Sequence, residues 1–159
     1  MKIAIFCIIT LTCTLIGFEF SASLRRRVTY LTQLQRALLE IEDAIGFLLL
    51  PLKEIYARLA LEPGAVGALF QNAAPGDSAS FEKALSSIGD LTRSDREILS
   101  SLGTFLGSSD RDNQLKNLQL CQKRLEENLS AAKENRKTNG RLYQSLGVLG
   151  GLFLAIVLL

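Results

Sequence analysis

The sequence predicts an all-α protein: a cytoplasmic helical bundle flanked by N- and C-terminal transmembrane helices. Two long segments carry apolar residues at helical spacings of three and four, and no segment shows the alternation typical of a strand. The first and last segments are apolar runs. We therefore expect three parts: an N-terminal transmembrane helix over residues 1–22, a cytoplasmic all-α domain over residues 23–141, and a C-terminal transmembrane helix over residues 142–159.

The first apolar run covers residues 3–20 and is interrupted by threonines and by Glu19. A signal peptide is one interpretation, with cleavage near the small residues 21–23. The arginines at 25–27 come almost directly after the run, however, and such basic flanks oppose translocation of the downstream chain. We therefore expect a retained membrane helix, with Glu19 near the interface, where its carboxylate can reach lipid headgroups or the arginines.

The last apolar run, residues 145–159, contains no charge and no proline. Leu142 and Tyr143 extend it to the roughly 17 apolar residues that a membrane span needs. A buried core helix is the alternative, although core helices usually keep a polar face. Gly147 and Gly151 form a G-x-x-x-G pattern, and small residues let membrane helices approach closely. We expect these two glycines to pack a helix in the membrane.

Basic residues flank both apolar runs on the side that faces the middle of the chain. Cytoplasmic flanks of membrane helices carry an excess of lysine and arginine. Both flanks therefore predict a two-span protein of the cell membrane with a cytoplasmic middle. The alternative is a secreted or membrane-tethered extracytoplasmic helical binding domain, and the basic flanks argue against it. The predicted membrane-orienting charges are Arg25, Arg26, Arg27, Arg136, Lys137 and Arg141.

An apolar stripe at helical spacing lies directly after the first run. Because no proline or glycine lies between residues 18 and 45, the first span is expected to continue as one long helix. Gly46 and Pro51 are expected to end it. Shorter helices are expected after Pro51 and over residues 66–72, 81–88 and 94–106. The stripe consists of Leu31, Leu34, Leu38, Ile41, Ile45 and Leu48.

Capping residues predict where the later helices begin. Ser80 and Ser94 are expected as N-caps, and Glu97, three residues after Ser94, would complete a capping box. Gly107-Ser-Ser-Asp110 is expected to end one helix and to cap a second long helix over residues 111–139, with Gly140 separating it from the last run. The two long helices should pack antiparallel. The apolar stripe of the second one consists of Leu115, Leu118, Cys121, Leu125, Leu129 and Ala132.

Composition argues against most catalytic chemistry. The chain of 159 residues has 18 basic and 16 acidic residues, a balance that gives no reason to expect nucleic-acid binding. It contains no histidine, the commonest general base and metal ligand. Cys7, Cys13 and Cys121 have no metal-ligand spacing and are expected as small buried residues. No phosphate-binding glycine loop occurs. We therefore expect no enzyme, no cofactor, no metal site and no small-molecule substrate.

Acidic clusters are the remaining candidate sites. Glu40, Glu42 and Asp43 lie close together on the first long helix. Paired carboxylates can perform acid–base chemistry. Solvated positions on a helix surface explain these residues better, and partner binding is their candidate function. Asp95 and Glu97 are expected as first-turn charges, which helix N-termini favour.

Several segments, taken in order, resemble those of a known family. The first span ends in Gly17-Phe-Glu-Phe, Leu24-Arg-Arg-Arg opens the next helical segment, and Pro51-Leu-Lys-Glu forms a proline–leucine turn. The most specific segment is Asn139-Gly-Arg-Leu-Tyr-Gln-Ser-Leu-Gly-Val-Leu-Gly-Gly. Together these segments resemble the stage III sporulation protein AB family over the whole chain. The turn Gly46-Phe-Leu-Leu-Leu-Pro51 is more apolar than expected for that family.

The resemblance implies a role in endospore formation. Members of the family belong to a complex of proteins AA to AH in the mother-cell membrane around the forespore, which resembles a secretion system and joins the two compartments as a channel. The AA member is a cytoplasmic ATPase, and the soluble part of AB is similar to a helical domain of the type II secretion system F protein. The resemblance therefore implies a membrane platform that couples the AA ATPase to the other membrane subunits.

Overall fold

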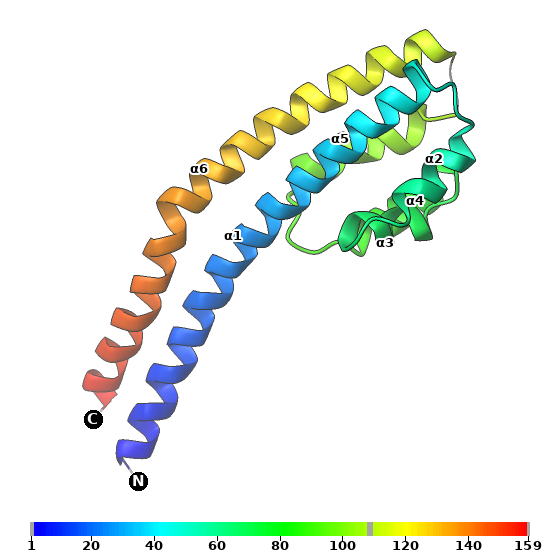
Figure 1. The fold of residues 1–159 in the computed structure, drawn as a ribbon. Helices are drawn as coiled ribbons and strands as arrows, with labels where there is room; N and C mark the ends of the chain where they lie inside the picture. Colours follow the sequence, from blue (N-terminus) through cyan, green and yellow to red (C-terminus); the bar gives the residue numbers. More distant parts are fainter. Residues whose placement is uncertain (1, 108–109, 159) are drawn as a thin grey trace. The chain divides into compact units, whose positions relative to one another are not determined.

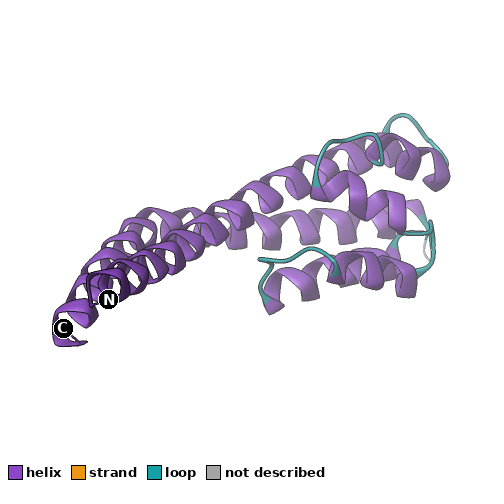
Figure 2. Ribbon diagram, turned by 90° about the horizontal axis from the view of Figure 1, so that it is seen from below, coloured by secondary structure: helices purple, strands orange, loops and turns teal. Residues whose placement is uncertain are grey.

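The secondary structure is helical (Figures 1 and 2). The computed structural model describes residues 2–107 and 110–158, apart from the side chains of residues 2–7, 9, 155, 157 and 158. Loops join the helices, and no strand occurs in the described residues, so the predicted all-α class is confirmed. The helices are α1 (Lys2–Gly46), α2 (Leu52–Leu59), α3 (Ala65–Asn72), α4 (Ser78–Ser86), α5 (Arg93–Phe105) and α6 (Arg111–Leu158).

The chain divides into two compact units. One unit joins residues 1–28 to residues 131–159, and we call it the terminal helix pair. The other unit comprises residues 29–130, and we call it the helical domain. Each of the long helices α1 and α6 contributes a segment to both units. The three parts predicted from the sequence, residues 1–22, 23–141 and 142–159, follow the apolar runs and have different boundaries from these two units. The predicted division stays a prediction.

Two apolar stripes form the centre of the helical domain. On α1, Leu31, Leu34 and Ile41 are each no more than 1% exposed. On α6, Leu118 and Leu125 are completely buried. These are the positions that the helical spacing selects, because residues three and four apart share one face. The two long helices are thus confirmed, and α6 continues through Gly140 without the predicted break.

The first stripe is shorter than the sequence suggests. α1 ends at Gly46, and the backbone N–H groups of Phe47 and Leu48 both donate to the carbonyl oxygen of Asp43, at 2.9 and 3.2 Å. These bonds turn the chain out of the helix. Leu48 is therefore 57% exposed in a loop, and its predicted place in the stripe is wrong.

Aromatic side chains join the short helices of the domain. The rings of Tyr56 on α2 and Phe70 on α3 meet edge to face, with their centroids 5.1 Å apart. Phe70 contacts Phe81 on α4 in the same way at 6.2 Å. All three side chains are buried, and such pairs add about 1 kcal/mol each beyond the apolar area that they bury. Burial also raises the pKa of Tyr56 to about 12.

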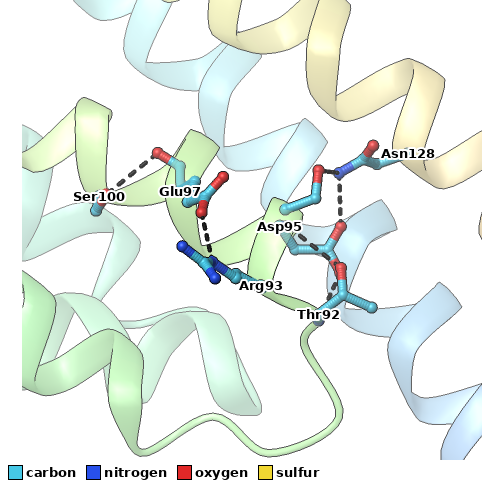
Figure 3. A network of polar contacts seen from close by, with 7 residues as sticks. Thr92, Arg93, Asp95, Glu97, Ser100 and Asn128 are labelled. Carbon is cyan, nitrogen blue, oxygen red and sulfur yellow. Dashed lines mark hydrogen bonds and ion pairs between the residues drawn. The ribbon is translucent and has the colours of Figure 1, made fainter.

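Two helix starts differ from the predicted ones. Asp77, not Ser80, caps α4, and its carboxylate accepts from Ala79 N at 3.0 Å. Thr92, not Ser94, caps α5 (Figure 3), because the backbone is already extended at Thr92 and becomes helical directly after it. Its hydroxyl accepts from Asp95 N, and Asp95 Oδ2 accepts from Thr92 N at 2.9 Å. The capping box is therefore Thr92–Asp95 and not Ser94–Glu97.

Asp110 caps α6, as predicted. Its carboxylate accepts from the backbone N–H of Asn113 at 3.3 Å and from the side-chain amide of Asn113 at 2.5 Å. These hydrogen bonds, the side-chain one foremost, lower the pKa of the Asp110 carboxyl. Ser108 and Ser109, which were expected to end the preceding helix, lie outside the described residues.

Candidate functional site

Glycines bring α1 and α6 into close contact in the terminal helix pair, where the two helices run side by side (Figure 1). A Cβ atom added to Gly17 would lie 2.6 Å from the carbonyl oxygen of Tyr143 and 3.0 Å from the Cα atom of Gly147. One added to Gly147 would lie 2.9 Å from the carbonyl oxygen of Cys13. One added to Gly151 would lie 3.0 Å from the Cβ atom of Cys13. These contacts leave no room for side chains.

Gly147 and Gly151 therefore pack against α1, a helix of the same chain. That this packing takes place in a membrane stays a prediction. Sequence reasoning missed the third member of this contact, Gly17. The signal for it is a single glycine near the end of the first apolar run. We call the contact of these three residues the glycine seam.

The outer surface of the terminal helix pair is apolar. The large apolar side chains there are between 37% and 66% exposed, and so many exposed apolar side chains on two neighbouring helices are unusual for a soluble monomer. In the described part of the chain, no helix is both long enough and apolar enough to cross a membrane. The exposed residues are Ile8, Leu11, Leu15, Ile16, Phe18 and Phe20 on α1, and Leu142, Tyr143, Leu146, Val148, Leu149, Leu152, Phe153, Leu154 and Ile156 on α6.

An aromatic contact and a polar contact border each other in the terminal helix pair. The rings of Phe20 and Tyr143 lie with their centroids 5.7 Å apart. One residue further along each helix, Gln144 Nε2 donates to the hydroxyl of Ser21 at 3.1 Å.

Next to this border the pair contains a groove of about 750 Å³. Its lining is mostly cationic and includes no carboxylate, and we call it the basic groove. On α6 the lining residues recur at spacings of three and four, so that they share one face of the helix. The groove is lined by Ser21, Arg25, Lys133, Arg136, Lys137, Gly140, Arg141 and Gln144.

The structure thus gathers four of the six predicted membrane-orienting charges in one groove, namely those at positions 25, 136, 137 and 141. The other two, Arg26 and Arg27, do not line it. Arg26 pairs instead with the carboxylate of Glu19 at 2.6 Å, one of the two environments expected for that carboxylate. Lys133 was missed as a member of the group, although its spacing of three and four residues from positions 136 and 137 is a signal for it.

The acidic candidates on α1 do not form one free face. Glu42 accepts from Gln119 Nε2 at 2.8 Å and from Gln122 Nε2 at 2.9 Å, so its carboxylate links α1 to α6 within the helical domain. Glu40 and Asp43 are exposed and lie three residues apart, which places them on one side of the helix. Partner binding stays a prediction for this group.

Comparison with protein families identifies the chain. The family described as stage III sporulation protein AB matches residues 2–159. The chain belongs to the stage III sporulation protein AB family. The resemblance seen in the sequence segments is thereby confirmed, and membership gives this AB-family chain a role related to sporulation. No curated protein and no solved structure matches the AB-family chain.

The loop after α1 is the most exposed apolar segment of the AB-family helical domain. Phe47, Leu48 and Leu49 are 82%, 57% and 66% exposed, and we call them the apolar turn. Leu49 has a φ angle of 53°, a left-handed conformation that costs an ordinary L-residue about 1 kcal/mol or more. Arg111 at the start of α6 donates to the carbonyl oxygen of Gly46 and so fixes the beginning of the turn.

The two cysteines whose side chains the structure describes are buried or half-buried. Cys121 is 3% exposed, and its thiol donates to the carbonyl oxygen of Ile98 at 3.6 Å. Burial raises the pKa of Cys121 to about 11, so its thiol stays protonated near neutral pH. Cys13 is half-buried beside the glycine seam, and the Cys7 side chain lies outside the described residues. Among the described side chains no group of three or more potential ligands could hold a metal ion.

Proposed function

We propose that this AB-family chain is a non-enzymatic membrane platform subunit of the secretion-like complex required for endospore formation. It would sit in the mother-cell membrane around the forespore and couple the cytoplasmic AA ATPase to the other membrane subunits. One observation carries the proposal: the terminal helix pair is packed internally by the glycine seam, presents apolar side chains outward and has cations at one end of its apolar surface.

The helix pair is suited to a bilayer although neither helix meets the usual criterion for crossing one. A helix satisfies its own backbone hydrogen bonds, as a membrane interior requires. The threonines of the first apolar run also find partners within α1. Thr12 Oγ1 donates to the carbonyl oxygen of Ile8 at 2.8 Å, and Thr14 Oγ1 donates to that of Thr10 at 2.7 Å. These bonds lower the cost of placing hydroxyls among acyl chains.

The cations set the proposed orientation. Lysine and arginine next to membrane helices stay on the cytoplasmic side. The residues of both flanks lead into the helical domain, so this domain faces the cytoplasm. There it can act as the counterpart of the helical domain of the type II secretion system F protein. Its all-helical structure supports this assignment.

We assign ATPase contact to the apolar turn. Phe47 is the main candidate within it, because aromatic side chains are enriched at the cores of protein interfaces. The strained φ angle of Leu49 supports the assignment, because strained backbone is often retained where it serves a function. The exposed Asp43 carboxylate, four residues before Phe47, adds a charge that can select the partner.

Topology tests the membrane part of the proposal. A single cysteine replaces the exposed Ser78 at the start of α4, in a chain in which Cys7, Cys13 and Cys121 are alanine. The protein is produced in a non-sporulating bacterium, and vesicles of either orientation are treated with a membrane-impermeant thiol reagent. We expect labelling in inside-out vesicles and protection in right-side-out vesicles. The reverse pattern would favour an extracytoplasmic binding domain, and a chain that washes off the membrane would refute membrane insertion.

Co-purification tests the ATPase contact. Phe47→Ser should reduce recovery of the AA ATPase with the full chain by about tenfold, because one interface anchor contributes about 1–2 kcal/mol or more. Leu61→Ser is the matched control, since Leu61 is 86% exposed but lies in the loop after α2. Equal loss in both variants, or in neither, would show that the apolar turn is not the contact.

A further inference from the structure

We infer that the basic groove binds the phosphate headgroup of an anionic phospholipid. The inference rests on the proposed insertion of the terminal helix pair into a membrane. It adds that the cations of the groove bind a specific ligand, beyond their proposed role in orienting the chain. Basic pockets between membrane helices on the cytoplasmic side are sites for acidic lipid headgroups.

The lining of the groove supplies the chemistry for a phosphate. Two guanidinium groups, from Arg136 and Arg141, offer planar pairs of N–H donors that match phosphate oxygens, and Arg25 adds a third guanidinium charge to the lining. Lys133 and Lys137 add two ammonium groups as point charges. Ser21 and Gln144 also lie in the lining and are joined to each other by a hydrogen bond. No lining residue is acidic, so an anion entering the groove meets attraction from every charged side chain.

The nearby carboxylates are engaged elsewhere. Glu19, on the same helix as Arg25, pairs with Arg26 outside the groove lining. Glu134, next to Lys133, accepts a hydrogen bond from Thr138 at 3.4 Å. The four lining cations on α6, from Lys133, Arg136, Lys137 and Arg141, share one face of the helix and repel one another. A bound phosphate relieves that repulsion, which makes the groove a binding site and not only a charged surface.

The setting of the groove favours a lipid as the source of the phosphate. Leu142 and Tyr143 lie between the lining residues Arg141 and Gln144, and Phe20 precedes Ser21, so exposed apolar side chains lie directly beside the groove lining. A headgroup in the groove would leave its acyl chains along this apolar surface. A volume of about 750 Å³ accommodates a glycerophosphate headgroup, since small-molecule sites span roughly 300–1,000 Å³. A free phosphate would use only part of it.

Lipid selectivity of the full chain tests the inference. The protein is reconstituted in phosphatidylcholine bilayers, and spin-labelled phosphatidylglycerol and phosphatidylcholine are compared by the fraction of each that is immobilised at the protein. We expect phosphatidylglycerol to be favoured. In the groove variant Arg136→Gln/Arg141→Gln the preference for phosphatidylglycerol over phosphatidylcholine should be about fivefold smaller. This is roughly the effect of one cation near a membrane surface.

A matched control separates a site from a charged surface. Arg26→Gln/Arg27→Gln also removes two cations from the basic flank, but neither residue lines the groove. This control should keep the preference of the wild-type chain. Circular dichroism of both variants should show unchanged helix content, so that a folding defect is not mistaken for loss of binding.

The contrary outcomes are distinct. An equal fall in both double variants, or no preference in the wild-type chain, would overturn the groove as a lipid site while leaving membrane insertion intact. Loss of the preference on addition of excess inorganic phosphate would assign the groove to free phosphate and overturn the lipid. Absence of immobilised phosphatidylcholine would show that the chain is not embedded, and the proposed function would fail with the inference.

Discussion

At the scale of single residues, Asp95 is the buried charge of the helical domain. It is 0% exposed, and its carboxylate accepts from Thr92 N at 2.9 Å and from Asn128 Nδ2 at 2.8 Å (Figure 3). It thus caps α5 and links that helix to α6. A buried donor that loses its acceptor costs about 1–3 kcal/mol, so this one carboxylate holds two helix contacts in place.

Asp95→Ala should therefore destabilise the chain by about 3 kcal/mol, measured by denaturant unfolding of the full chain in mild detergent. Glu97→Ala is the control. Its carboxylate pairs with Arg93 on the surface at 2.8 Å, and the loss of such a pair costs at most about 1 kcal/mol. Similar losses in the two variants would contradict the structural role of Asp95.

Leu49→Gly should stabilise the helical domain by about 0.5 kcal/mol, because the relief of the left-handed steric cost exceeds the chain entropy that glycine adds to the unfolded state. The exposed side chain contributes little packing that could be lost. Leu48→Gly is the control, since Leu48 has no positive φ angle and glycine there only adds chain entropy to the unfolded state. Unfolding of the full chain measures the stability of both variants. A stabilised Leu49→Gly chain that has lost ATPase binding would also tie the strain to function.

The Cys121 thiol should make stability depend on pH in alkaline solution. Its folded pKa, raised to about 11 by burial, exceeds the usual thiol value of 9.0, so the folded chain retains a proton that the unfolded chain releases. This contribution is complete below pH 9.0 and is lost as the pH rises through about 11. Cys121→Ala should flatten the dependence of the unfolding midpoint on pH in that interval. An unchanged slope would contradict the burial of the thiol.

At the scale of elements, the glycine seam determines how closely α1 and α6 approach in the terminal helix pair. Gly17→Ala should lower the unfolding midpoint of the full chain in detergent, because the added Cβ meets backbone atoms at 2.6 and 3.0 Å that cannot turn aside. Gly150→Ala should raise it slightly, since nothing lies within 4 Å of an added Cβ and alanine favours a helix by about 1 kcal/mol. Equal effects would show that the seam does not hold the pair together.

The helices themselves could largely be predicted from the sequence. Apolar spacing on α1 and α6 identifies their buried faces, because the period of a helix is a local property. The residues at which helices begin are predicted less well, as the predicted N-cap Ser94 in place of Thr92 illustrates. Both residues are good N-caps, and in the folded chain Asp95 completes the capping box of Thr92 while also accepting from Asn128, which is far away in the sequence. The exposure of Leu48 likewise depends on where the backbone leaves α1, which apolar spacing does not determine.

At the scale of the whole molecule, the basic flanks should fix the orientation of the chain. Replacing all six predicted membrane-orienting residues with glutamine should give a mixture of orientations, because the excess of cytoplasmic lysine and arginine is removed. The Ser78 cysteine and vesicle labelling measure the mixture. The control removes six exposed cations of the helical domain and should keep a single orientation: Lys53, Arg58, Lys83, Lys116, Lys123 and Arg124.

The sequence predicts the charges of the candidate site better than their arrangement. Arg136 and Arg141 stand out next to an apolar run, but only packing of α1 on α6 shows that Arg25 joins them and that Arg26 does not. Gly17 was missed for the same reason, since its partner Gly147 comes from the other end of the chain. The acidic group was predicted from proximity alone, and the contacts of Glu42 with α6 show how little proximity says about which side chains are free.

The division of the chain into two units also determines the order in which they can fold during synthesis. The helical domain uses residues 29–130 without interruption, whereas the terminal helix pair needs both the first 28 residues and those from 131 onward. During synthesis the domain can therefore fold first, and the N-terminal helix must wait until its partner segment over residues 131–159 has been made. Its apolar surface is exposed throughout that interval. Early delivery to a membrane would protect the nascent chain, and the glycine seam would close as one of its last steps of assembly.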